Sequence, residues 1–350
     1  MILLRRQSLV AYGAPLCETV TEYPAPRGTE VLVRVQRCGV CHSDLHMQDG
    51  YFDLGDGKKL DVTSGRALPF TLGHEIAGVV EQKGPNAEVK VGAAVAVFPW
   101  IGCGACAACA AGEENLCSAP RHLGIYADGG FATHVLVPHP RYLLEYEPLS
   151  AGFAAALMCS GLTAYAALRR LTQQAQRGPV LLVGMGGVGM MGLAIAKALF
   201  PQPPFVADID PYKREAALQA GAAAAFDPAD SAARKALIAA TGGITAACDF
   251  VGSAGSFAFA QGALARGGKL MITGLFGGSL SMPLAMLPIK AQAIEGLLAG
   301  TRAETHELFA LARAGKITPL PISERPLAQA QSALDDLRGG RVVGRVVLSA

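Results

Sequence analysis

Short apolar runs bounded by glycine, proline and polar residues recur through the first third of the chain. They are VLVRVQRCGV at 31–40, HEIAGVVEQ at 74–82 and AAVAVFPW at 93–100. Runs of this length in this setting are typical of β-strands. We therefore predict a β-rich region over residues 1–150.

From about residue 151 helical periodicity alternates with short apolar runs. The runs are PVLLVG at 179–184, FVADID at 205–210, AACDFV at 246–251 and KLMITG at 269–274. Strands that alternate with helices predict a parallel sheet covered on both faces, so the fold class is α/β with a doubly wound domain over 151–290. The alternation stops near 291. We expect the remaining helix (305–316) and final strand (341–349) to return to the first domain, which then comprises 1–150 and 291–350.

The composition indicates a compact protein, because 51% of residues are hydrophobic and 17% are charged. A net charge of +2 without a long run of one sign gives no reason to expect a nucleic acid or a membrane surface as partner. The first residues place arginines after a short apolar run, the reverse of a signal peptide, and no apolar run reaches the roughly 20 residues of a membrane span. We expect a cytoplasmic protein.

One glycine-rich turn has the spacing of a dinucleotide-binding loop. Gly184, Gly186 and Gly189 follow an apolar strand and open an amphipathic helix. These glycines would allow a tight turn, close approach of a pyrophosphate and close packing of helix on strand. The turn also contains Gly187 and Val188, and the helix N-terminus offers free N–H groups to phosphate. In a chain with 42 glycines the alternative is an ordinary turn.

A carboxylate follows this motif at the distance that ribose recognition requires. Asp208 stands 19 residues after Gly189, at the end of the next predicted strand. It can accept hydrogen bonds from ribose hydroxyls and would repel a 2′-phosphate, which favours NAD over NADP. Lys213 is a second candidate for the ribose.

Four of the nine cysteines lie within fifteen residues, at Cys103, Cys106, Cys109 and Cys117. Four thiolates on one loop suit a closed, tetrahedral structural zinc site that leaves no position for a substrate. The alternatives are a disulfide cluster, which a reducing compartment disfavours, and an iron–sulfur cluster, whose usual spacing differs.

Three further candidate ligands are scattered: Cys41, His74 and Cys159. Taken singly, a cysteine with apolar neighbours is usually packed in the core, and a lone histidine usually makes ordinary hydrogen bonds. Composition and spacing do not bring these three residues together.

Over essentially its full length the sequence resembles the zinc-dependent medium-chain alcohol dehydrogenases, above all their bacterial and archaeal branch. The similar stretches are CGVCHSDLH, LGHEIAGVV, the four-cysteine lobe with GEENLC, LMCSGLTAY, VGMGGVG and the terminal GRVV. The resemblance implies a GroES-like catalytic domain beside a Rossmann domain. It also implies that Cys41, His74 and Cys159 hold a catalytic zinc with one open position.

The resemblance assigns roles to further residues. Asp44 and Glu75 would orient the zinc site, and Arg345 would lie near the cofactor phosphates. Ser43 would face the reacting oxygen, and His46 would end a proton relay that passes through the cofactor ribose. Weaker assignments place residues near the pyrophosphate (His42) and in the substrate pocket (Trp100 and Leu275).

The implied activity is NAD-linked, reversible oxidation of primary or secondary alcohols to aldehydes or ketones, with two zinc ions per chain and a homodimeric or homotetrameric assembly. A polyol dehydrogenase is the nearest alternative, but that branch usually has Glu in place of Cys159. Zinc-free quinone reductases lack both ligand groups, whereas this chain has both. A zinc-ribbon module that binds nucleic acid would carry a basic patch, which a net charge of +2 does not suggest. A non-catalytic relative would not need the intact ligand and relay residues.

One stretch departs from the family pattern. Residues 49–69 are long and polar, and they look inserted before LGHE. Such a loop can cap a pocket or lie on the surface, and it leaves the size of the substrate open.

Overall fold

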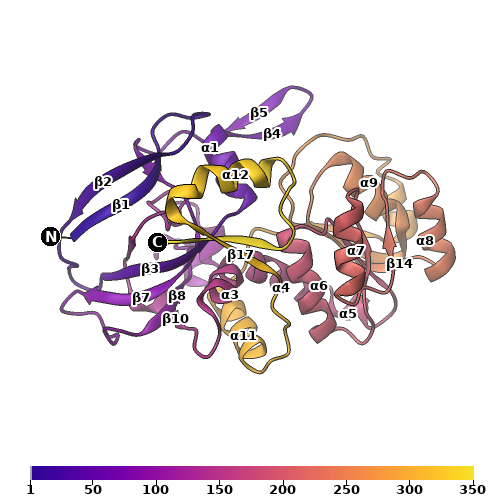
Figure 1. The fold of residues 1–350 in the computed structure, drawn as a ribbon. Helices are drawn as coiled ribbons and strands as arrows, with labels where there is room; N and C mark the ends of the chain where they lie inside the picture. Colours follow the sequence, from indigo (N-terminus) through magenta and orange to yellow (C-terminus); the bar gives the residue numbers. More distant parts are fainter. Residues whose placement is uncertain (1) are drawn as a thin grey trace.

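Two parts, one rich in strands and one built on a parallel sheet, make up the protein (Figure 1). The computed structural model describes residues 2–350. The strand-rich part contains the N-terminal third and also the C-terminus, whereas the parallel sheet is formed by the middle of the chain. The predicted α/β fold with two parts is confirmed.

The strand-rich part contains two main sheets. In the smaller sheet the order is β2 (Cys17–Tyr23), β1 (Ile2–Leu9) and β6 (Phe70–Thr71). The larger sheet runs in the order β10 (Leu143–Glu145), β8 (Ala94–Val97), β7 (Glu75–Lys83), β3 (Val31–Gly39), β18 (Arg345–Ser349) and β17 (Ile322–Pro326), with β9 (His134–Val137) also on β3. The C-terminal strand β18 pairs directly with β3, so the end of the chain completes the larger sheet.

The middle of the chain forms a six-stranded parallel sheet. Its order is β13 (Ala225–Phe226), β12 (Phe205–Ala207), β11 (Val180–Val183), β14 (Ile244–Asp249), β15 (Leu264–Ile272) and β16 (Ala293–Gly296). The first strand in sequence lies at the centre and the chain winds outward in both directions, which is the doubly wound arrangement.

Alternate residues of this sheet face two different cores. Leu182, Cys248 and Met271 point to the core that contains α4 and α6, whereas Leu181 and Leu270 point to the core that contains α8 and α9. This alternation follows from the period of two along a strand, and burial on both faces explains why these strands are almost wholly apolar.

The helices of the middle region surround the sheet or connect it to the strand-rich part. They are α3 (Ala151–Ala156), α4 (Leu162–Arg169), α5 (Thr172–Ala175), α6 (Gly187–Leu199), α7 (Pro211–Gln219), α8 (Ala233–Thr241), α9 (Ala254–Ala263), α10 (Met286–Lys290) and α11 (Arg302–Arg313). The strand-rich part carries α1 (His42–Asp49), α2 (Ala107–Ala110) and α12 (Ala330–Arg338). Four short helical segments complete the elements: η1 (Glu114–Leu116), η2 (Pro140–Tyr142), the π-helix η3 (Leu157–Gly161) and η4 (Leu327–Gln329).

The second predicted domain limit falls inside the parallel sheet. β16 pairs with β15 although it lies beyond residue 290, where we predicted this domain to end. The four-residue segment AIEG is too short to be recognised as a strand from its pattern. We therefore propose a limit after Gly296.

A continuous helical stretch, Ala151–Arg169, is the one helix among residues 2–350 that is long and apolar enough to cross a membrane by length and composition. In its most apolar window 89% is buried inside the protein, as in a core helix.

Candidate active site

A cavity of about 600 Å³ opens between the two parts of the molecule. It begins at the carboxyl ends of β11 and β12 and reaches Cys41 and Cys159 in the strand-rich part. In doubly wound sheets the carboxyl ends of the central strands are where ligands bind. The predicted cofactor and catalytic residues that line this cavity are Cys41, His42, Ser43, His46, Trp100, Cys159, Gly184, Gly186, Gly187, Val188, Gly189, Asp208, Lys213, Leu275 and Arg345.

The glycine loop has the geometry that its spacing predicts. Gly184 adopts φ +87°, in the left-handed region that favours glycine. A Cβ on Gly189 would come within 1.8 Å of the Gly184 carbonyl oxygen, so only glycine lets α6 approach β11 this closely. A Cβ on Gly186 would meet nothing within 4 Å, and the backbone there is open to a ligand.

Asp208 fixes this loop as well as facing the cavity. Its carboxylate accepts a hydrogen bond of 2.6 Å from the Met185 N–H and one of 2.9 Å from the Asp210 N–H. A carboxylate offers about four acceptor positions, so capacity for ribose hydroxyls remains. The Lys213 ammonium lies 3.8 Å from Asp210.

A buried group of ligand-capable side chains lies at the inner end of the cavity. The ligand atoms of Cys41, His74, Glu75 and Cys159 lie within 4.8 Å of one another, and all four residues are buried. Three different elements supply them: the N-cap of α1, the start of β7 and the π-helix η3. A π-turn inside a helix is frequent at functional sites, and here it carries Cys159. The Cys41 and Cys159 sulfurs are 4.0 Å apart.

Asp44 connects the pieces of this group. Its carboxylate accepts hydrogen bonds from the N–H groups of Cys41 (2.9 Å) and Gly73 (3.1 Å), and Oδ1 lies 3.4 Å from His74 Nδ1. Because Asp44 contacts the residue before His74 and the ring itself, it positions the imidazole. His74 Nε2 is buried and has no hydrogen-bond partner among residues 2–350.

Glu75 and Arg345 form a buried ion pair behind the same group. Arg345 Nε donates to Glu75 Oε2 at 2.9 Å, and Nη2 donates to Oε1. A Cβ on Gly187 would lie 2.8 Å from Arg345 Nη1, so the guanidinium also touches the glycine loop. Arg345 thus joins the predicted zinc site to the predicted phosphate site.

The site shifts the pKa values of its members in opposite directions. The hydrogen bond with Cys159 holds the pKa of the Cys41 thiol well below its ordinary value and raises that of Cys159. Burial lowers the pKa of His74, but the charges of Asp44 and Cys41 outweigh burial and raise it. Burial raises the pKa of Glu75 against the opposing effect of Arg345.

The chemistry of these donors fits a zinc ion. Two sulfurs and one imidazole nitrogen converge, and the unpartnered His74 Nε2 is the atom that a metal would satisfy. Glu75 also lies within reach, but its carboxylate is engaged by Arg345. Two cysteines and one histidine form a known catalytic zinc set that leaves a position open.

The remaining predicted residues stand around the cavity. Ser43 Oγ lies 3.9 Å from Cys41 Sγ, and the His46 ring packs on Phe52 with centroids 4.5 Å apart. Burial lowers the pKa of both His46 and His42. Trp100 is buried, and its indole N–H donates to the Met158 carbonyl oxygen at 3.1 Å.

The four-cysteine lobe lies outside this cavity. The sulfurs of Cys103, Cys106, Cys109 and Cys117 lie within 4.8 Å of one another, and only Cys117 is buried. Hydrogen bonds from the backbone at Cys109 and Ser118 lower the pKa of Cys106 to about 6, whereas burial raises that of Cys109 to about 11. Four converging sulfurs fit a closed zinc site.

The sequence did not indicate several residues that line the cavity. Leu297, Leu298 and Ala299 follow β16, the strand that was not predicted. Two others are Thr163 on α4 and Arg338 at the end of α12. The signal that could have found the first group is its position after a parallel strand, but β16 was itself not predicted.

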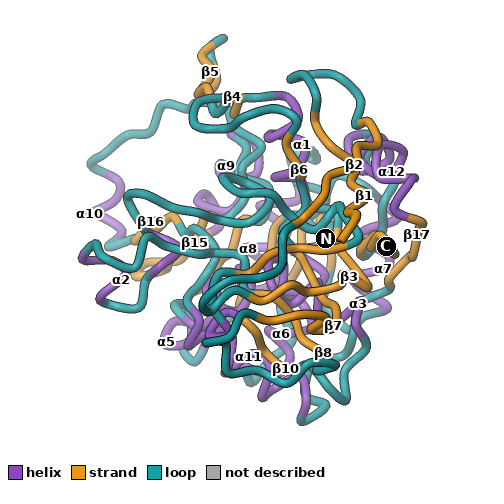
Figure 2. Tube along the Cα trace, turned by 90° about the vertical axis from the view of Figure 1, so that its left-hand side faces the viewer, coloured by secondary structure: helices purple, strands orange, loops and turns teal. Residues whose placement is uncertain are grey.

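The polar stretch 49–69 forms a hairpin of β4 (Tyr51–Gly55) and β5 (Lys58–Asp61). Figure 2 shows β5 projecting from the body of the molecule. The Ser279 hydroxyl donates to Asp56 at 2.6 Å, so the hairpin contacts the loop that follows β15. It lies mostly on the surface, and its contact with the second part of the molecule is at this turn.

Comparison with known proteins agrees with this geometry. Residues 27–147 match the alcohol dehydrogenase GroES-like domain, and residues 187–314 match the zinc-binding dehydrogenase family. The chain is 37% identical to an NAD-dependent alcohol dehydrogenase of Sulfurisphaera tokodaii over 99% of both chains.

Solved structures also superpose over the whole chain. The alcohol dehydrogenase of Aeropyrum pernix is 30% identical with a TM-score of 0.89, covering 99% of this chain and 100% of that one. The D-arabinose dehydrogenase of Sulfolobus solfataricus is 26% identical with a TM-score of 0.86, covering 100% of each. The similarity extends through both parts of the molecule, and the chain belongs to the zinc-dependent medium-chain alcohol dehydrogenase family.

Proposed function

We propose that the protein is an NAD-dependent zinc alcohol dehydrogenase that interconverts alcohols with aldehydes or ketones. The observation that carries the proposal is the single cavity that joins the glycine loop to the buried Cys41, His74 and Cys159 group. A cofactor on the loop and an alcohol oxygen at the ligand group would then lie in one space. The membership in the family and the names of the similar proteins support the same reaction.

When bound, zinc supplies Lewis acidity that lowers the pKa of an alcohol oxygen, and NAD supplies a hydride acceptor. Cys41, His74 and Cys159 would hold the metal, and Asp44 would keep the imidazole oriented. The Ser43 hydroxyl would accept the proton of the alcohol while donating its own proton onward, along the cofactor ribose, toward His46. His46, whose pKa is lowered by burial, would be neutral at pH 7 and free to accept that proton at the cavity wall.

The cofactor would lie along the glycine loop with its phosphates toward the N-terminus of α6. Gly184, Gly186, Gly187, Val188 and Gly189 would give it a close backbone approach, and Arg345 and His42 would stand near the phosphates. Asp208 and Lys213 would bind the ribose, and the carboxylate would disfavour a 2′-phosphate.

The second zinc ion is proposed for the four-cysteine lobe, where it would have a structural role. Trp100, Leu275 and Leu298 give the substrate end of the cavity an apolar character, which favours alcohols over polyols and sugars.

We also propose a homodimer or homotetramer in the cytoplasm. The outer edge of β16 is unpaired among residues 2–350, and exposed Leu284 and Ile289 lie nearby on the chain. Unpaired edges and apolar surface are features of contacts between subunits. Reduced thiols in both ligand groups suit a reducing compartment.

The test is a turnover assay joined to a metal count. NAD or NADP is mixed with primary, secondary and aromatic alcohols and with D-arabinose, while absorbance of the reduced nicotinamide is followed. We expect NAD-dependent turnover of alcohols and about two zinc ions per chain. No turnover in a fully zinc-loaded sample would reject the enzymatic proposal, and a metal-free preparation that still turns over would reject the ligand assignments.

A further inference from the structure

One wall of the cavity is a short segment with an unfavourable backbone. Leu297, Leu298 and Ala299 follow β16 and line the cavity. Ala299 is buried and adopts φ +52°, a left-handed conformation that side chains with a Cβ rarely take. Such a conformation persists only where the surroundings hold it, and it is enriched at functional sites.

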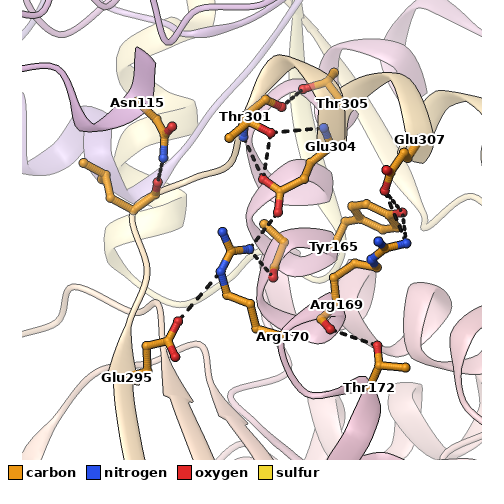
Figure 3. Close-up of polar contacts among 12 residues, drawn as sticks. Asn115, Tyr165, Arg169, Arg170, Thr172, Glu295, Thr301, Glu304, Thr305 and Glu307 are labelled. Atoms are coloured by element: carbon orange, nitrogen blue, oxygen red, sulfur yellow. Dashed lines mark hydrogen bonds and ion pairs between the residues drawn. The ribbon is translucent and has the colours of Figure 1, made fainter. Parts of the chain in front are cut away.

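The ends of this segment are held by ionic contacts with Arg170, the residue that follows α4 (Figure 3). Arg170 lies 3.7 Å from Glu295 on β16 and donates to Glu304 at 2.7 Å. Glu304 in turn accepts from the Thr301 N–H at 2.8 Å and caps α11. These contacts fix the chain before and after the segment, but they do not reach Leu298.

The middle of the segment is held by the four-cysteine lobe. Asn115 stands on η1, between the third and fourth lobe cysteines, and is 5% exposed. Its Nδ2 donates to the Leu298 carbonyl oxygen at 2.8 Å, across 183 residues of sequence (Figure 3). The neighbouring Glu114 lies 3.4 Å from Arg302 at the start of α11, so the lobe is joined to this wall at two points.

We propose that Asn115 is a positioning residue that sets the shape of the substrate pocket. It does not line the cavity itself, and it acts by holding the Leu298 carbonyl and thereby the left-handed turn at Ala299. The lobe then has a role in substrate selection as well as in stability. This inference rests on the proposed function for its kinetic test.

The first test replaces Asn115 with leucine, which has a similar size and no donor. We expect KM for alcohols to rise about fivefold, the factor for one lost hydrogen bond, with kcat within about twofold. The matched control is Glu307→Gln, which removes the charge that faces Arg169 at 3.3 Å, on the same pair of helices but away from the wall. Unchanged KM in Asn115→Leu, or an equal rise in the control, would overturn the proposal.

Amide hydrogen exchange tests the same contact without any turnover. We expect faster exchange at 297–301 in Asn115→Leu and unchanged exchange there in Glu307→Gln. This result stays readable if the wild type oxidises no alcohol, so failure of the proposed function is separate from failure of the inference. Equal exchange in wild type and Asn115→Leu would contradict a positioning role.

A second substitution tests whether the bond holds the left-handed backbone. Glycine adopts positive φ without cost, so adding Ala299→Gly to Asn115→Leu should bring KM back to within about twofold of wild type. No recovery would overturn the link between Asn115 and Ala299. If Asn115→Leu accumulates poorly, Asn115→Ser takes its place, because the serine side chain is too short to reach the Leu298 carbonyl oxygen. The same outcomes apply to it.

Discussion

The two groups of metal-ligating side chains differ in how the chain brings their ligands together. In the lobe, four cysteines converge within one loop of fifteen residues, and three of them are partly exposed. In the cavity, Cys41 and Cys159 are 118 residues apart and meet only because α1, β7 and η3 pack around them. The first group is a local product of spacing, and the second is a product of the whole fold.

This difference predicts which property each group controls. A buried site that is assembled by packing is preorganised for chemistry, whereas a partly exposed loop of converging cysteines depends on its metal for its shape. Substitutions in the cavity should therefore change the rate, and substitutions in the lobe should change stability and the pocket wall.

The largest effect is expected for Cys159→Ser. The loss of one thiolate should lower kcat/KM for alcohols at least about 10³-fold, because the activation of the alcohol oxygen supplies several kcal/mol. The zinc count should fall from two to one. Cys248→Ser, another buried cysteine outside both groups, is the control and should retain both zinc ions and activity. A variant of Cys159 with wild-type activity would remove it from the site.

Asp44→Asn should have the next largest effect. The amide keeps the size of the side chain but has one acceptor oxygen, whereas the Cys41 N–H and the Gly73 N–H each bond a different carboxylate oxygen, so one of them would face a donor. We expect a loss of about 10- to 100-fold in activity or zinc affinity, as for other groups that orient a metal ligand. Asp128→Asn removes a carboxylate from the same part of the molecule and should change activity little. Steady-state kinetics and zinc titration of both variants test this prediction, and equal activity and zinc affinity in Asp44→Asn and Asp128→Asn would contradict it.

The sequence predicted the local group and the glycine loop from residues alone, because both depend on short spacing. It could not bring Cys41, His74 and Cys159 together, since their meeting depends on strand pairing and on the π-turn at η3. Only resemblance to a family supplied that assignment.

The pocket wall shows the limit most clearly. Leu297–Ala299 follow a four-residue strand with no apolar pattern, and Asn115 contacts them across 183 residues. Neither periodicity nor spacing carries information about such a contact. The central strand β11 was in contrast predicted to within one residue at each end, because burial on both faces determines its composition.

A smaller effect, with a distinct pH signature, is expected for His46→Gln. Burial lowers the pKa of His46 from its ordinary value of 6.5. As pH increases, its imidazole therefore loses its proton earlier than a free histidine does, and the neutral ring can accept a proton. In the wild type, kcat/KM for alcohol oxidation should rise as pH increases through this lowered pKa. The variant should lose that step and be about tenfold slower above it. His306→Gln, on the exposed face of α11, should keep the wild-type profile, and an unchanged profile in His46→Gln would remove it from the relay.

The smallest effect on rate is expected for Cys106→Ser in the lobe, and this variant tests the comparison from the other side. One zinc ion should be lost, and the melting temperature should fall by roughly 4 °C, for a loss of about 3 kcal/mol. The kcat should stay within about twofold at low temperature, while KM should rise as it does in Asn115→Leu, because a loosened lobe no longer holds Leu298.

The control is Cys17→Ser, which replaces an exposed cysteine on β2 and should change none of these values. A fall in kcat as large as that of Cys159→Ser would mean that the lobe takes part in the chemistry. An unchanged KM would mean that the wall keeps its shape without the lobe.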